Sequence, residues 1–126
     1  MSMRTPLSRA RGLGAAREGA RHFWWQRLTA VANIPLALAF VVVVINLVGA
    51  DYEAARELVA RPPVAVLILL LILSATYHMR IGMQAIIEDY VAGDGLRIVA
   101  LAANTLFAIL IAVACGFAVL RISLGD

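Results

Sequence analysis

The chain has 126 residues, of which 63% are hydrophobic; its mean hydropathy is +0.89 and its formal net charge is +3. A soluble domain of this size could not bury so much apolar surface, so the composition excludes that class and indicates an integral membrane protein. The positive charge is no signal for nucleic-acid binding, because the basic residues lack a folded platform of their own.

Residues 1–26 form a basic segment that is nearly free of acidic residues. All eleven basic residues of the chain are arginines, and six precede or open the first apolar run: Arg4, Arg9, Arg11, Arg17, Arg21 and Arg27. Such a composition is found in mitochondrial transit segments and in basic cytoplasmic tails. We favour a retained tail, which the positive-inside rule places in the cytoplasm together with the N-terminus.

Three apolar runs follow, each long enough for the roughly 20 residues that a membrane-spanning helix needs. Open strands cannot cross hydrocarbon, so an all-α membrane protein with three transmembrane helices is expected, as one domain over residues 1–126. The short linkers predict antiparallel neighbours and a C-terminus on the periplasmic side. The spans are placed at Leu28–Gly49, Val64–Ile87 and Ile98–Leu120, with helices over about 28–49, 64–91 and 96–120.

The residues before the first span read His22-Phe23-Trp24-Trp25-Gln26-Arg27. The paired tryptophans are typical of an aromatic belt at the membrane interface. His22 and Arg27 are suited to hold anionic groups such as haem propionates or lipid phosphates. The alternative is that these side chains are snorkelling anchors without a ligand.

His78 lies inside the second span, where an ionisable residue is costly and a functional site is the default hypothesis. At about 100° per residue, Ser74, His78, Gly82, Ala85 and Asp89 share one helix face. This face is consistent with a haem site, because it offers an imidazole as a ligand and small residues that let a flat ring approach. The alternative is a hydrogen bond from His78 to a Ser or Thr of a neighbouring helix.

No second histidine lies well inside a span, so a bis-histidine iron would need a ligand from another chain. Arg80 points nearly opposite to His78. A buried arginine should pair with an acid, a propionate or a helix end, and we therefore expect Arg80 to contact a partner chain. The single cysteine, Cys115, excludes an internal disulfide and any cysteine-ligated cluster, and we expect it to be a small buried side chain.

Glu88, Asp89 and Tyr90 stand together at the end of the second span. A tyrosine hydroxyl can donate to a quinone carbonyl, and a nearby carboxylate can relay protons. The alternative is an interfacial aromatic residue beside solvated acids.

Together these residues resemble the haem-b membrane anchor family of succinate dehydrogenase, respiratory complex II. The resemblance covers about residues 19–120 and rests on the segment 22–30, on His78-x3-Gly82-Met83, and on Asp89-Tyr90-Val91. It implies a haem b held between this chain and a sister anchor, with His78 as one axial ligand to the iron. It also implies a ubiquinone site at the cytoplasmic edge, with Tyr90 in contact with quinone and Asp89 beside it. His22 and Arg27 match the family pattern only loosely.

The sequence is therefore interpreted as the membrane anchor of a succinate:quinone oxidoreductase. The anchor itself does not oxidise succinate; that reaction is expected to take place on partner subunits, a flavoprotein and an iron–sulfur protein. A second membrane anchor and the lipid bilayer complete its partners, and no nucleic acid is expected. A bacterial cytoplasmic membrane is the expected location, with the mitochondrial inner membrane as the alternative. The rival functions are a fumarate reductase anchor and a small non-haem transporter or assembly protein that uses His78 and Asp89 as a proton relay.

Overall fold

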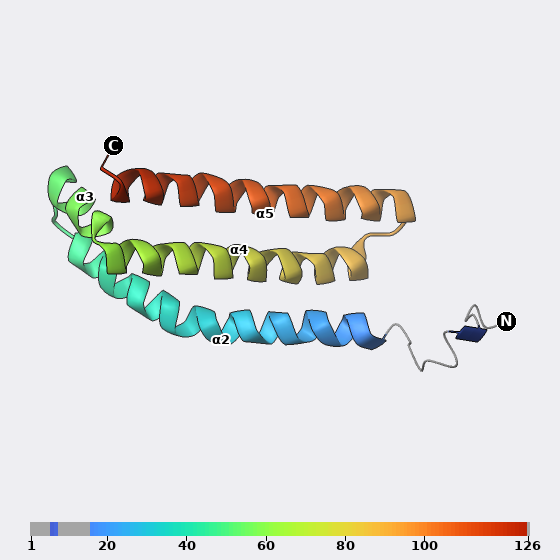
Figure 1. The fold of residues 1–126 in the computed structure, drawn as a ribbon. Helices are drawn as coiled ribbons and strands as arrows, with labels where there is room; N and C mark the ends of the chain where they lie inside the picture. Colours follow the sequence, from blue (N-terminus) through green and yellow to red (C-terminus); the bar gives the residue numbers. More distant parts are fainter. Residues whose placement is uncertain (1–5, 8–15, 126) are drawn as a thin grey trace.

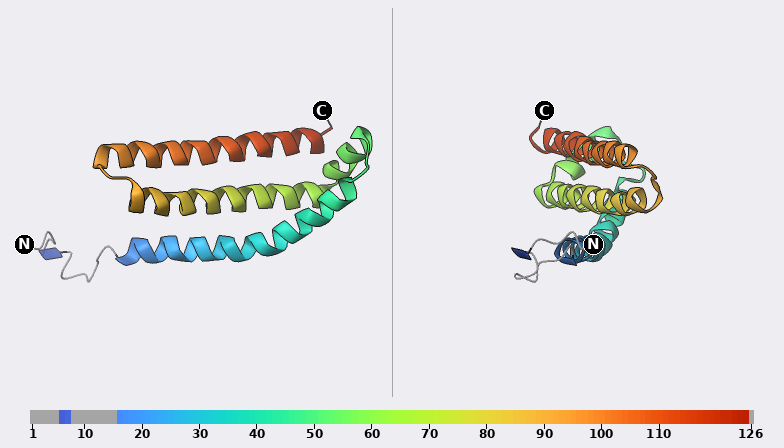
Figure 2. Two further views of the ribbon diagram at one scale, coloured as in Figure 1. Left: turned by 180° about the vertical axis from the view of Figure 1, so that it is seen from behind. Right: turned by 90° about the vertical axis from the view of Figure 1, so that its right-hand side faces the viewer.

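The computed structural model describes residues 6–7 and 16–125. Within residues 16–125 it contains three long helices and one short helix. Helix α2 covers Ala16–Leu47, α3 covers Tyr52–Ala60, α4 covers Pro62–Tyr90 and α5 covers Asp94–Ser123. The long helices run antiparallel in chain order, and α4 lies between α2 and α5 (Figure 1). The end-on view in Figure 2 shows them as a single row.

All three long helices are long and apolar enough to cross a membrane, which confirms the expected all-helical architecture. Few side chains are buried within the chain, and large apolar residues are exposed along every long helix. In water this surface would be unstable, whereas lipid and neighbouring membrane helices can cover it. The small set of buried residues consists of Val43, Ala65, Ile81, Ile87, Ala108, Val119 and the polar Thr29.

Helix α2 begins at Ala16, well before the span expected from Leu28. Three arginines of the topology argument, Arg4, Arg9 and Arg11, lie outside the described residues. The second half of α2, beyond Pro35, bends toward α3 (Figure 1). Proline removes a backbone donor and its ring crowds the preceding turn, which accounts for a bend within a helix.

The connection between α2 and α4 contains α3, which the sequence reading did not anticipate. Asp51 caps α3 by accepting a hydrogen bond from the Ala54 backbone N–H at 2.9 Å. Pro62 opens α4, where its missing N–H would have had no helical partner. Gly93, at a φ of 92°, closes the three-residue turn into α5, a conformation that favours glycine.

The expectation that Cys115 is buried is wrong for this chain, because the residue is exposed on the surface of α5. Hydrophobic character alone does not separate a residue packed inside a membrane bundle from one on its lipid-facing side.

Candidate functional site

A row of polar and small side chains lies between α2 and α4, and we call it the polar seam. Its members on α2 are spaced three or four residues apart and therefore share one face, as do its members on α4. The polar seam consists of Gln26, Thr29 and Asn33 on α2 and Ser74, His78 and Gly82 on α4. Three buried oxygens of the seam lack a hydrogen-bond partner among the described residues: Gln26 Oε1, Asn33 Oδ1 and Ser74 Oγ. Buried polar groups are usually satisfied, so the seam has unused bonding capacity.

His78 lies at the centre of the polar seam and is half-buried. Its Nδ1 is 3.0 Å from the Oγ1 atom of Thr29, which is buried with only 8% of its surface exposed. This is the helix–helix hydrogen bond that the sequence offered as an alternative to haem ligation. The two interpretations are compatible, because an imidazole has a second ring nitrogen that can bind iron.

Gly82 lies one turn beyond His78 and faces Gln26 of the same chain. A Cβ atom added at Gly82 would stand 3.4 Å from Gln26 Nε2, which is ordinary to slightly tight contact. The side chain of Gln26 thus occupies the space beside Gly82, at the interface between α2 and α4. The face that carries Ser74, His78 and Gly82 is therefore turned toward α2.

A groove of about 400 Å³ opens where α2 begins and α4 ends. Its lining residues come from these two helices: Gly19, His22, Phe23, Gln26, Ile81, Gln84, Ala85 and Glu88. This volume is in the range of small-ligand clefts. The groove contains His22, which the sequence singled out, and Glu88, whose Oε1 accepts a hydrogen bond from Gln84 Nε2 at 2.8 Å.

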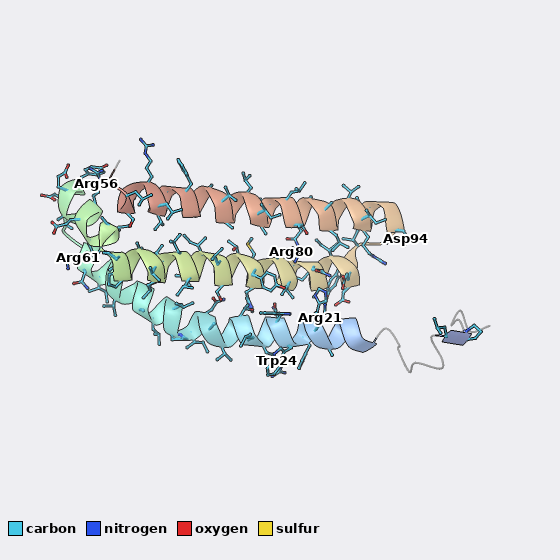
Figure 3. The ribbon with its side chains drawn as sticks, viewed as in Figure 1. Arg21, Trp24, Arg56, Arg61, Arg80 and Asp94 are labelled. Atoms are coloured by element: carbon cyan, nitrogen blue, oxygen red, sulfur yellow. The ribbon has the colours of Figure 1, made fainter. Side chains whose placement is uncertain are left out.

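The other candidate residues near this end of the bundle stand outside the groove. Tyr90 is the last residue of α4 and is 83% exposed, and Asp89 is also exposed. The guanidinium of Arg27 lies 4.4 Å from the centre of the Phe23 ring, a cation–π contact. Trp24 points away from α4 (Figure 3), as a residue in an interfacial aromatic belt would. Of the residues singled out from the sequence, His22 therefore lines the groove, whereas Tyr90, Asp89 and Arg27 lie outside it.

Arg80 has its contacts on the opposite side of α4, where it joins α4 to α5 (Figure 3). Its Nε donates to the Oγ1 of Thr105 at 3.2 Å, and the Asn104 side-chain amide donates to the Arg80 backbone oxygen at 2.9 Å. These contacts join α4 to α5 within the chain, and the expected contact of Arg80 with a partner chain stays a prediction. Arg80 acts as a brace between two helices and lies away from the His78 face.

Sequence reasoning missed the role of Thr29 and of Gln26 in the polar seam. The signal was present at the start of the first span and just before it, because His22, Gln26, Thr29 and Asn33 recur at intervals of three or four residues. In a membrane helix, such a polar stripe indicates the face that meets another helix.

Comparison with known proteins identifies the family of the chain. The profile of the succinate dehydrogenase/fumarate reductase transmembrane subunit family matches residues 1–119. The succinate dehydrogenase hydrophobic membrane anchor subunit of Paracoccus denitrificans is 32% identical over 121 residues, covering 96% of this chain and 93% of the relative. The corresponding subunit of Rickettsia bellii (strain RML369-C) is 30% identical over 111 residues, covering 88% and 89%. No solved structure gave a significant match. The chain therefore belongs to the succinate dehydrogenase/fumarate reductase transmembrane subunit family.

Proposed function

We propose that this chain anchors a succinate:quinone oxidoreductase in the membrane, provides one axial ligand to a haem b through His78, and forms part of a ubiquinone site with Tyr90 and Asp89. The observation that carries the proposal is the half-buried imidazole of His78, which is held by one ring nitrogen within a membrane span of a chain of this family. An ionisable side chain at that depth is expected to serve a cofactor or a substrate.

Two observations of the residues present fit a haem. The Nδ1 of His78 is engaged by Thr29, whereas no hydrogen bond reaches Nε2 from any residue that the structure describes. A metal-binding histidine commonly has this arrangement, with one nitrogen anchored and the other toward the metal. Unused polar atoms of the seam, on Asn33 and Ser74, lie one turn away. When bound, the haem supplies one-electron redox chemistry that no side chain of this protein offers.

The second axial ligand must come from another chain. His22 is the only other histidine, and it lines the groove roughly 10 Å along α2 from Thr29, at a rise of about 1.5 Å per residue. We therefore propose that a sister membrane anchor provides the second histidine. His22 and Arg27 lie where they can hold anionic groups, such as haem propionates, at the membrane edge.

The quinone site is proposed at the end of α4, where the exposed Tyr90 hydroxyl is available as a hydrogen-bond donor. Negative charge grows on a quinone carbonyl oxygen during reduction, so a fixed donor stabilises the reduced forms more than the quinone. Asp89 is exposed beside it and can exchange protons with water. Because Tyr90 is open on most sides, a sister anchor and the iron–sulfur subunit are needed to enclose the substrate.

The proposed assembly contains a flavoprotein subunit, an iron–sulfur subunit and a second membrane anchor, in a bacterial cytoplasmic membrane or its mitochondrial counterpart. A fumarate reductase anchor would belong to the same family and share the same residues. The relay of protons between His78 and Asp89 is less well supported, because they are about 16 Å apart along α4 and His78 is occupied by Thr29.

The direct test is to purify the complex through a tag on this chain. We expect mass spectrometry to identify a flavoprotein, an iron–sulfur protein and a second small membrane protein, and a reduced-minus-oxidised spectrum to show a low-spin haem. Recovery of the chain without flavoprotein and iron–sulfur subunits would reject the anchor function.

The proposed orientation, with the groove end in the cytoplasm, is tested by cysteine labelling. In a Cys115→Ala background, single cysteines at Asp94 and Arg56 mark opposite ends of the bundle (Figure 3). A membrane-impermeant thiol reagent added to intact cells should label the cysteine at position 56 and spare that at position 94. The reverse pattern would invert the topology and place Tyr90 on the side away from the cytoplasm.

A further inference from the structure

Thr29 makes three close polar contacts through one oxygen. Its Oγ1 is 2.8 Å from the Trp25 backbone oxygen, 3.2 Å from the Gln26 backbone oxygen and 3.0 Å from His78 Nδ1. A hydroxyl has one hydrogen to donate and two lone pairs with which to accept. The two backbone oxygens can only accept, so the direction of each bond follows from where that single hydrogen lies.

The shortest contact, to the Trp25 oxygen, is the bond that a threonine inside a helix makes to the preceding turn. If the hydrogen lies there, the Thr29 oxygen must accept from His78, and Nδ1 must carry a proton. The opposite assignment, with Thr29 donating to Nδ1, would leave two oxygens facing each other at 2.8 Å without a hydrogen between them. The geometry therefore selects the Nδ1-protonated form of the neutral imidazole.

We infer that Thr29 is a positioning residue that fixes the tautomer and the ring orientation of His78, so that the Nε2 lone pair is prepared to bind iron. The inference rests on the proposed haem function. Thr29 does not touch the iron itself; it acts through the imidazole, as the hydrogen-bonding partners of metal-binding histidines do.

The surrounding packing keeps this hydrogen bond in place. Trp25 precedes Thr29 by one turn, and its ring meets that of Tyr77, the neighbour of His78, edge to face with 6.0 Å between centroids. The side chain of Gln26, the next residue on α2, lies beside Gly82 of α4. The Trp25–Tyr77 contact and the Gln26–Gly82 approach join the turns of α2 and α4 next to the Thr29–His78 bond, which favours a defined orientation of the imidazole.

The chain provides a matched control for this hydroxyl. Thr76 also bonds to its preceding turn, with its Oγ1 donating to the Ile72 oxygen at 2.6 Å, but the structure records no contact between it and an imidazole. Thr29→Val and Thr76→Val therefore remove the same group from similar helical settings. Thr29→Ser restores the hydroxyl at the seam and should rescue whatever depends on it.

The first test reads the tautomer without haem. The full-length chain, labelled with nitrogen-15 at histidine and placed in lipid nanodiscs, has two imidazoles, which are assigned by comparison with His22→Gln. We expect His78 to be protonated at Nδ1 in the wild-type chain, in Thr29→Ser and in Thr76→Val, and to lose this preference in Thr29→Val. Protonation of His78 mainly at Nε2 in the wild-type chain, or an unchanged tautomer in Thr29→Val, would overturn the inference.

The second test uses the intact complex and measures haem. Loss of a hydrogen-bonding partner of a metal ligand typically weakens metal binding by about 10- to 100-fold. Thr29→Val should show this loss of haem affinity and altered ferric haem g-values by electron paramagnetic resonance, whereas Thr29→Ser and Thr76→Val should resemble wild type. Equal effects in Thr29→Val and Thr76→Val would reduce Thr29 to a packing residue and overturn the inference. Absence of haem from the wild-type complex would instead reject the proposed function, and the nitrogen-15 measurement would still report the tautomer.

Discussion

Replacement of Tyr90 by phenylalanine should slow quinone reduction strongly while leaving the fold intact. Tyr90 is 83% exposed at the end of α4, and its hydroxyl makes no hydrogen bond to any residue that the structure describes. Removing it should therefore change the free energy of unfolding by less than about 0.5 kcal/mol. The loss of one preorganised donor to a developing oxyanion costs roughly 3 kcal/mol in the transition state, or about a hundredfold in rate.

The assay compares two electron acceptors in the purified complex. Succinate-driven reduction of ubiquinone should fall by about two orders of magnitude in Tyr90→Phe, while reduction of a soluble dye, which bypasses the membrane site, should be nearly unchanged. Tyr52→Phe is the matched control, because Tyr52 is 76% exposed and lies at the opposite end of the bundle. Full ubiquinone activity in Tyr90→Phe would refute the role of the hydroxyl, and an equal loss with both acceptors would show that the complex itself is damaged.

Two further predictions concern the stability of the α4–α5 pair and of α3. Asn104→Leu removes the hydrogen bond to the Arg80 backbone oxygen and should destabilise the α4–α5 pair by about 0.6 kcal/mol, and by no more than about 1.7 kcal/mol. The control, Asn46→Leu, breaks only a bond within its own helix and should not disturb that pair. Thermal unfolding in detergent compares the two variants, and equal losses of stability would contradict the bracing role. Asp51→Ala removes the side-chain acceptor of the Ala54 N–H and should destabilise α3 by about 1 kcal/mol. We expect faster hydrogen exchange confined to α3, and unchanged exchange would contradict this prediction.

The long helices were predictable because hydrophobicity and length decide what crosses a membrane. The start of α2 at Ala16 was not, because residues 16–27 are rich in charge and carry no apolar signal of a span, although they continue the same helix. Helix α3 was missed because its nine residues are mixed in polarity, and a single cap at Asp51 defines its beginning.

The shared face of Ser74, His78 and Gly82 followed from helical periodicity alone. Periodicity does not say which neighbour that face meets, and here the neighbour is α2 of the same chain. The partners of His78 and Arg80 are Thr29 and Thr105, 49 and 25 residues away in sequence. Pairings at that separation depend on how the helices pack, which the sequence of one helix does not contain.

The central claim is that His78 binds haem iron in a complex assembled around this anchor. The most direct measurement is the reduced-minus-oxidised spectrum of the purified complex with His78→Gln, alongside His22→Gln, which alters the only other histidine of the chain. We expect the low-spin haem b signal to be lost or converted to high spin in His78→Gln, with all subunits still present, and low-spin ligation to persist in His22→Gln. An unchanged low-spin spectrum in His78→Gln would contradict the account.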